Sequence, residues 1–273
     1  MINTQQFKQY LQQRKLRAVS IDSYMRDIEQ FCDYLTHAGI YHISEITGHE
    51  IKRYCDYMMQ KGLAAVSMQR KIASIKRLFE YLCESGQARC NPASGVLIRK
   101  RGAAKAKVLT DEQLSYLLSM PDTRSVGGIR DKAMFALINS TGIKVSELIA
   151  LHMEDLRMPE KCVGISREGG AVQLQLDDEV CRCLGAYLAA RDMLFPKDDR
   201  TLFLNVYGEP ITRQGVWKTL KKYAEAAQME GITLETIRRS FARRYLNSGN
   251  DIRSLCDILG HSDIAITRAY VKS

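Results

Sequence analysis

Residues 236–270 read TIRRSFARRYLNSGNDIRSLCDILGHSDIAITRAY. Four arginines fall between positions 238 and 244, and the spacing of Arg239 and Arg243 places them on one face of a helix. His261 follows, and Tyr270 comes nine residues after it. An arginine fork matches a pair of phosphate oxygens, and a tyrosine can act as a covalent nucleophile. The segment therefore indicates either a phosphoryl-transfer site that uses cations in place of a metal, or a basic helix beside a tyrosine that only packs.

The residues before this segment predict a mainly α domain with a small β-sheet. Thr110-Asp-Glu-Gln113 is a capping box that marks the start of the domain, and apolar residues at helical spacing follow it. Two runs, Cys162–Ser166 and Ala171–Leu176, flank Arg-Glu-Gly-Gly and predict a β-hairpin. Helical patterns return from about residue 178 to the end of the chain.

The first 90 residues predict a separate helical domain. Ser20 is the candidate cap of one helix, and Thr47-Gly-His-Glu50 is a capping box that opens another. A third helix carries an apolar stripe of Met68, Ile72, Ile75, Phe79 and Leu82. Its other face carries the basic residues Arg70, Lys71, Lys76 and Arg77. These side chains form either a solvated face or a DNA-binding surface.

A basic linker is expected at residues 91–107, between a helical domain at 1–90 and a second domain at 108–273. Asn91-Pro92 breaks the helical pattern. The stretch after it lacks apolar periodicity and holds five basic residues and no acidic one, and these are Arg99, Lys100, Arg101, Lys105 and Lys107. Basic linkers of this kind commonly run along phosphate backbones.

The composition favours a polyanionic partner, because the formal net charge is +9 and the sequence pI is about 9.1. No apolar run approaches the roughly 20 residues of a membrane helix, and the N-terminal residues contain no apolar signal core. We therefore expect a cytoplasmic protein that makes no membrane contact. The eight cysteines include no C-x-x-C pair, which favours reduced thiols over a zinc site.

Four segments of the chain, taken in order, resemble the sequence boxes of the tyrosine recombinase (phage integrase) family. Residues 140–151, STGIKVSELIAL, resemble T-G-[LM]-R-[VI]-x-E-L-x-x-L, and residues 236–242, TIRRSFA, resemble x-L-R-H-[ST]-F-A. Residues 258–262, ILGHS, resemble L-G-H-[SA], and residues 267–270, TRAY, resemble T-x-x-Y. The N-terminal half is also similar to the family, in residues 24–28, residues 68–75 and Asn91-Pro92.

The resemblance implies a helical, SAM-like core-binding domain followed by a mixed α/β catalytic domain of the DNA breaking-rejoining type. In the family these two domains clamp double-stranded DNA, and the proteins assemble on it as tetramers, in some cases with a related recombinase. Family members carry out site-specific recombination or integration. Attack by a tyrosine breaks one strand and leaves a 3′-phosphotyrosyl link, and no metal or cofactor is needed.

Three catalytic positions of this chain match the family pattern. Arg238 falls at the second arginine of the family, His261 at the later histidine and Tyr270 at the nucleophile. Arg239 and Arg243, on the same helix as Arg238, are expected to contact DNA.

Three other catalytic positions depart from the pattern. Lys144 stands at the first arginine, which keeps the charge but loses the bidentate fork. Arg167 falls at or beside the hairpin lysine, the family's proton donor to the leaving 5′-oxygen, and arginine is a poor donor because its pKa exceeds about 12. Glu235 replaces the earlier histidine and would repel a phosphate in a dry site.

These departures leave two functions open within the family. One is an active strand transferase, and the other is a catalytically impaired DNA-binding relative that acts with an active partner. A third hypothesis, a helical transcription regulator, shares only DNA binding and does not account for Tyr270 together with His261 and Arg238.

Overall fold

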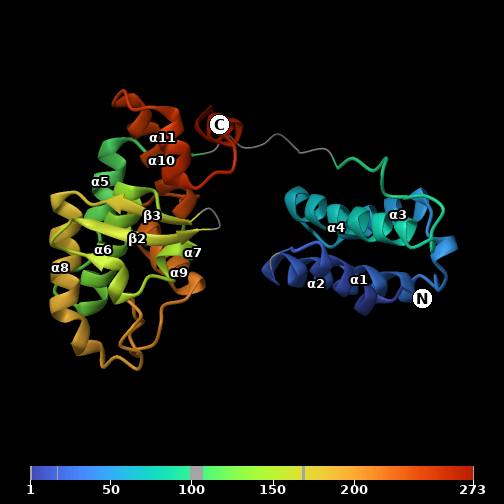
Figure 1. The fold of residues 1–273 in the computed structure, drawn as a ribbon, viewed down its shortest axis with the longest axis horizontal. Helices are drawn as coiled ribbons and strands as arrows, with labels where there is room; N and C mark the ends of the chain where they lie inside the picture. The colour runs from blue at the N-terminus through green and yellow to red at the C-terminus, as the bar shows by residue number, and fades with distance from the viewer. Residues whose placement is uncertain (1, 17, 99–106, 168–169, 273) are drawn as a thin grey trace. The chain divides into compact units, whose positions relative to one another are not determined.

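The computed structural model describes residues 2–16, 18–98, 107–167 and 170–272. The chain divides into two compact units, residues 1–103 and 104–273, and each has its own hydrophobic core (Figure 1). No helix among the described residues combines the length and the apolar character that a membrane span requires.

The first unit is entirely helical in its described part. Its elements are α1 (Thr4–Gln13), α2 (Ala18–His37), the short 3₁₀ helix η1 (Ile43–Glu45), α3 (Gly48–Gln60) and α4 (Ala65–Glu84). Helices α2 and α4 pack against each other, and α1 contacts both. The apolar stripe predicted on α4 lies in the core, with Ile75 fully buried, and it packs with Ile28 and Phe31 of α2, which are also fully buried.

The starts of two helices differ from the sequence prediction. Ser20 lies inside the first turn of α2, so the predicted cap is wrong; the exposed Val19 belongs to no apolar stripe and gave no sign of the extra turn. Thr47 is the residue before α3, as predicted, but its side chain makes no capping hydrogen bond. The Glu50 side chain, the other half of the expected box, forms an ion pair with Arg53 at 3.2 Å.

Residues 91–98, which the sequence assigned to the linker, belong to the first unit and pack against its helices. The Asn91 side chain donates to the Lys76 carbonyl at 2.9 Å, and the Gln69 side chain donates to the Ile98 carbonyl at 2.8 Å. Ala93 is fully buried in the core of this unit. The following part of the predicted linker, residues 99–106, lies outside the described residues.

The second unit is mainly helical with one small sheet, as the sequence predicts. Before and within the sheet its elements are α5 (Asp111–Ser119), α6 (Val126–Thr141), α7 (Val145–Leu148), η2 (Met153–Asp155), β1 (Leu156–Arg157), β2 (Cys162–Arg167) and β3 (Gly170–Gln175). After the sheet they are α8 (Asp178–Arg191), η3 (Asp192–Leu194), α9 (Arg213–Ala226), α10 (Leu234–Asn247), α11 (Ile252–Leu259) and α12 (Ile264–Lys272).

Helix α6 forms the centre of this unit. Residues 133–138 are all buried, and the helix contacts α5, α8 and α10 (Figure 1). A helix that is apolar on most sides belongs inside a domain. The capping box at Thr110 is confirmed, because its hydroxyl accepts from the Gln113 amide at 3.2 Å and the Gln113 side chain accepts from the Thr110 amide at 3.1 Å.

The sheet is antiparallel, with strand order β1-β2-β3. Val163 pairs with Leu174, and Ile165 pairs with Val172, which confirms the predicted hairpin. Residues 168–169, between β2 and β3, lie outside the described residues. The hairpin brings Arg167, the last residue of β2, close to the C-terminal helices.

The last three helices form a small layer of their own. Helix α11 contacts both α10 and α12, and α10 contacts α12. Gly260 ends α11 in the left-handed conformation, with φ +59°, and so turns the chain toward α12. Phe241, Leu255 and Leu259 are buried in the layer, and Tyr270 packs against them. This packing joins the end of α11 to the segment that carries Tyr270.

Candidate active site

Three cations from distant parts of the sequence meet at the carboxyl end of α11. Arg167 donates to the carbonyls of residues 257 and 258, at 2.6 and 2.9 Å. Arg238 donates to the carbonyl of residue 259, and the Lys144 ammonium donates to that of Gly260 at 2.9 Å. The last carbonyls of a helix have no partner within it and carry a partial negative charge. The end of α11 therefore accounts for the close approach of three positive side chains.

Arg238 links the ends of two helices. Besides its bond at the end of α11, its Nε donates at 2.7 Å to the carbonyl of Gly142, the left-handed residue that ends α6. The residue is only 7% exposed. Such a buried guanidinium is held in a fixed position before any phosphate arrives, which is what electrostatic catalysis requires.

Arg167 is bound on its other side by a carboxylate. Its Nε donates to Glu147 Oε1 at 2.8 Å and its Nη2 donates to Glu147 Oε2 at 3.2 Å, and both side chains are 11% exposed. Glu147 also accepts the backbone N–H of Lys144 at 2.9 Å, at the start of α7. The guanidinium thus joins β2, α7 and α11.

His261 follows directly on Gly260 and contacts the candidate nucleophile. Its Nδ1 lies 2.9 Å from the Thr267 hydroxyl, and its ring stands edge-on to the Tyr270 ring with centroids 5.2 Å apart. Burial, followed by the charges of Arg238 and Lys144, lowers the pKa of His261 to about 4. The imidazole is therefore neutral at pH 7.

The lowered pKa of His261 predicts a loss of stability in acid. Between pH 6.5 and 4 the unfolded chain binds a proton that the folded chain does not. The free energy of unfolding therefore decreases as the pH is lowered through this range. Because the ring is partly exposed, we expect His261 to contribute on the order of 1–2 kcal/mol to this fall.

Urea unfolding of the wild type and of His261→Gln at pH 7 and pH 4.5 measures this contribution. Trp217 is the single tryptophan and lies in the second unit, so its fluorescence reports on the unit that holds His261. The wild type should lose more stability than the variant on acidification. An equal loss in both proteins would contradict the assignment.

Tyr270 lies on α12 with its hydroxyl oxygen buried. The Arg239 guanidinium carbon is 4.4 Å from the centre of its ring, and Arg239 is also 3.7 Å from a carboxylate oxygen of Glu235. Burial and then the nearby Glu235 carboxylate raise the pKa of Tyr270. The phenol is protonated at neutral pH, so an attack by its oxygen requires removal of this proton.

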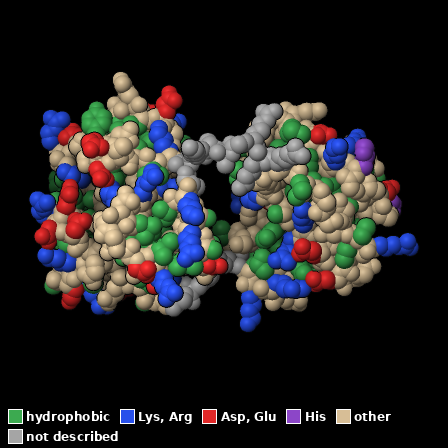
Figure 2. Space-filling model, turned by 90° about the horizontal axis from the view of Figure 1, so that it is seen from above, with side chains coloured by type: hydrophobic (Ala, Val, Ile, Leu, Met, Phe, Trp, Pro, Cys, Tyr) green, Lys and Arg blue, Asp and Glu red, His purple; other side chains and the backbone are tan. Residues whose placement is uncertain are grey.

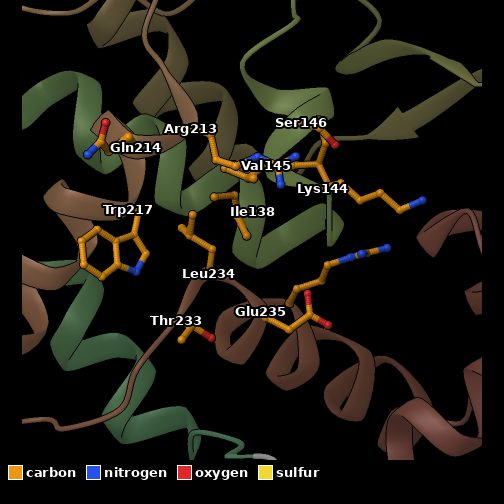
Figure 3. A pocket seen from close by; sticks show the side chains of 12 residues that line it. Ile138, Lys144, Val145, Ser146, Arg213, Gln214, Trp217, Thr233, Leu234 and Glu235 are labelled. Carbon is orange, nitrogen blue, oxygen red and sulfur yellow. The ribbon is translucent and has the colours of Figure 1, made fainter. Parts of the chain in front are cut away.

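A pocket of about 750 Å³ opens beside these groups. Lys144, Glu235 and Arg238 line it together with Arg213 and Trp217 of α9. Figure 3 shows Trp217 at one end of the pocket, with Lys144 and Glu235 toward the other. The pocket is large enough for a phosphodiester and part of a nucleotide.

The pocket is also lined by Arg213, Gln214 and Trp217 of α9, which were not predicted from the sequence. A signal was present, since Arg213, Trp217 and Lys221 alternate basic and aromatic character behind Thr212, whose hydroxyl caps the helix. Lys221 lies over the Trp217 ring, 5.5 Å from its centre. Basic and aromatic side chains on one exposed helix are typical of a nucleic-acid surface.

The basic face predicted on α4 is only partly exposed. Lys71 was expected among the exposed cations, but it is 6% exposed, and its ammonium donates to Asp27 at 3.1 Å and to Gln30. The packing of α4 on α2 explains the difference, because the Asp27 carboxylate is itself buried there. Arg70 is exposed and also contacts Asp27.

The remaining predicted DNA contacts have varied surroundings. Lys76 and Arg77 are half-buried, and Arg77 forms an ion pair with Glu80 at 2.9 Å. Arg243 on α10 is exposed, and the Lys107 ammonium donates to the carbonyl of Glu230. Residues 99–106 lie outside the described residues. Lys and Arg side chains are visible on both units, interspersed with acidic ones (Figure 2).

The described residues include no cluster of His, Cys, Asp or Glu that could hold a metal ion. All eight cysteines are free thiols.

Two family models match the chain. Residues 4–86 match the phage integrase, N-terminal SAM-like domain, and residues 107–273 match the phage integrase family. The chain is 31% identical over 266 residues to the tyrosine recombinase XerC of Roseiflexus castenholzii. This alignment covers 94% of this chain and 84% of the relative. It is 34% identical over 264 residues to the tyrosine recombinase XerD of Listeria monocytogenes, covering 94% and 89%.

Solved structures share the fold at lower sequence identity. The Tn1549 transposon integrase in complex with a circular intermediate DNA has a TM-score of 0.79 and 21% identity, covering 99% of this chain and 95% of that one. The XerH site-specific recombinase bound to its palindromic difH substrate has a TM-score of 0.75 and 19% identity, covering 99% and 81%.

The fold and these matches define a DNA strand transferase of the tyrosine recombinase class. The chain belongs to the phage integrase family.

Proposed function

We propose that this chain is a site-specific recombinase in which Tyr270 breaks a DNA strand and holds its 3′ end as a phosphotyrosyl link. The observation that carries the proposal is the meeting of Lys144, Arg167 and Arg238 at one helix end, directly before His261. The His261 ring in turn contacts the ring of Tyr270. Cations, a neutral imidazole and a phenol in one place suit attack on a phosphodiester.

The proposed reaction conserves the number of phosphate ester bonds. The Tyr270 oxygen bonds to phosphorus, the bond between phosphorus and the 5′-oxygen breaks, and a 5′-hydroxyl is released. The phenol loses its proton and the leaving oxygen gains one. A 5′-hydroxyl from another strand can then attack the phosphotyrosine and rejoin DNA without a further energy source.

Arg238 and Glu235 have different roles in the proposed reaction. Arg238 is fixed by its two carbonyl bonds and presents its charge to the non-bridging oxygens of the phosphate. Glu235 is half-exposed beside Tyr270 and Arg239, so water reduces its repulsion of a phosphate. Its proximity to the phenol suits removal of the phenolic proton.

The proposed partner is double-stranded DNA, bound by both units, and the proposed assembly is a tetramer on DNA. Similar solved structures include the λ integrase dimer bound to a core site, with a TM-score of 0.75 and 14% identity. The net charge of +9 suits the same partner.

An impaired relative that acts with an active recombinase is the second candidate. Lys144, Arg167 and Glu235 favour it, because each departs from the family pattern. The two candidates differ in whether the chain alone forms a covalent link.

A nicked suicide duplex separates the candidates. The duplex carries a site selected by the protein from a random DNA pool, and cleavage next to the nick releases a short fragment that cannot rejoin. We expect the wild type alone to become linked to the 3′ phosphate and to leave a free 5′-hydroxyl. Specific binding without a link would favour the impaired relative, and no specific binding would contradict both.

DNA affinity should fall steeply with salt, because each phosphate contact releases counterions and adds about 0.9 to the slope of log affinity against log salt. The five basic residues of the predicted linker are Arg99, Lys100, Arg101, Lys105 and Lys107. Replacing all five with Gln should lower this slope and weaken binding to every DNA sequence to a similar extent. Fluorescence anisotropy on cognate and random duplexes tests both points. A wild-type slope near zero would contradict the proposed DNA clamp.

A further inference from the structure

The leaving 5′-oxygen needs a proton, since an alkoxide is a poor leaving group near neutral pH. The side chain that supplies it must reach the pocket and hold a proton that it can release.

Arg167 meets neither requirement. Its guanidinium makes two bonds to Glu147, at 2.8 and 3.2 Å, and two to the carbonyls of residues 257 and 258, at 2.6 and 2.9 Å. It is absent from the lining of the pocket. It also packs so closely on Gly260 that a Cβ there would lie 2.9 Å from the guanidinium carbon. An arginine does not give up its proton in a protein.

The other groups near the pocket are also poor donors to the leaving oxygen. Burial keeps His261 neutral at pH 7, and its Nδ1 lies 2.9 Å from the Thr267 hydroxyl. Tyr270 is the proposed nucleophile, and Glu235 lies beside it. Arg213 and Arg238 are guanidinium groups and do not release a proton.

Lys144 meets both requirements. Among the residues that line the pocket in the described part of the chain, it is the one lysine. Its Nζ lies 2.9 Å from the Gly260 carbonyl, which directly precedes His261, and this bond fixes the ammonium at the end of α11. Its backbone N–H is held by Glu147, the same carboxylate that binds Arg167. An ammonium group can release a proton and take it back.

We propose that Lys144 donates the proton to the leaving 5′-oxygen and that Arg167 is a positioning residue. Relative to the family pattern, in which the hairpin lysine donates this proton, the roles of the two positions are exchanged. An N–H bond of Lys144 breaks as an O–H bond forms on the 5′-oxygen, and a neutral amine remains. In the reverse step this amine takes the proton from the attacking 5′-hydroxyl. The inference rests on the proposed function of Tyr270.

A DNA substrate with sulfur in place of the bridging 5′-oxygen tests the inference. A thiol has a pKa near 8.5, so a thiolate leaves without a proton donor. Lys144→Arg keeps the positive charge and removes the transferable proton. We expect it to slow adduct formation on the oxygen substrate by at least about a hundredfold, and to react within about threefold of the wild type on the sulfur substrate.

Arg167→Met is the contrasting variant. Because Arg167 acts through its bonds to Glu147 and α11, its loss should slow both substrates by similar factors. Rescue of Arg167→Met by sulfur, with no rescue of Lys144→Arg, would overturn the inference. Equal defects of Lys144→Arg on both substrates, or full activity of Lys144→Arg on oxygen, would overturn it too.

The failure of the proposed function looks different. If the chain does not break DNA, the wild type forms no adduct with either substrate; if another residue is the nucleophile, the adduct survives in Tyr270→Phe. In both cases the proposed function of Tyr270 falls, whatever the result for Lys144→Arg. If only the inference is wrong, the wild type forms the adduct on both substrates and Lys144→Arg shows no selective rescue.

Discussion

Replacing Tyr270 with Phe should abolish the covalent protein–DNA link, by at least about a thousandfold, while DNA affinity stays within about threefold, or about 0.65 kcal/mol. The substitution removes the hydroxyl and keeps the ring that packs against Phe241 and Leu255. The Arg239 guanidinium 4.4 Å from the ring centre also keeps its contact. Denaturing gels for the link and fluorescence anisotropy for affinity measure the two effects separately.

Tyr245→Phe is the matched control. Tyr245 lies on α10, 5.8 Å from Phe241 between ring centres, in the same apolar layer as Tyr270. This variant should form the link at a rate close to that of the wild type. Cleavage that survives Tyr270→Phe and disappears in Tyr245→Phe would reverse the assignment of the nucleophile.

Replacing Arg238 with Ala should lower adduct formation by about a hundred- to a thousandfold and also destabilise the second unit. The substitution removes a fixed charge from the pocket, and it leaves the carbonyls of Gly142 and Leu259 without this donor. Loss of such buried bonds costs about 1–3 kcal/mol. Single-turnover cleavage at saturating DNA and urea unfolding followed by Trp217 fluorescence measure the two losses.

Two variants separate charge from fold in this prediction. Arg238→Lys keeps the charge and should recover part of the activity, but it cannot bridge the ends of α6 and α11 as the arginine fork does. Arg182→Ala removes an exposed arginine on α8 and should change neither cleavage nor stability. An Arg238→Ala protein that cleaves normally would contradict the proposed role.

Much of the fold followed from the sequence because each signal was local. The apolar stripe of α4 has the period of a helix, and the run at 171–176, directly after Arg-Glu-Gly-Gly, alternates apolar and polar residues. The Thr110 capping box depends on residues only three positions apart. The extra turn at the start of α2 was missed because Val19 is exposed and adds nothing to a stripe.

The sequence predicted which residues form the candidate site, but it did not predict the contacts between them. The order of the boxes pointed to Arg238, His261 and Tyr270, which the structure brings together. The departures from the family pattern could not show that Arg167 binds Glu147, because the two residues lie 20 positions apart on different elements. The three cations bind backbone carbonyls, which every residue carries, so the amino-acid types of the sequence do not predict these partners.

Peptide mapping of the covalent adduct tests the central claim most directly. Trypsin cuts after Arg268 and Lys272, so Tyr270 lies on the short peptide Ala269–Lys272. After the suicide duplex is trapped and digested with nuclease, mass spectrometry should find a nucleotide phosphate on this peptide, and none there in Tyr270→Phe. A nucleotide on the peptide that begins at Tyr245, or no protein-linked nucleotide on a duplex that the chain binds specifically, would contradict the account.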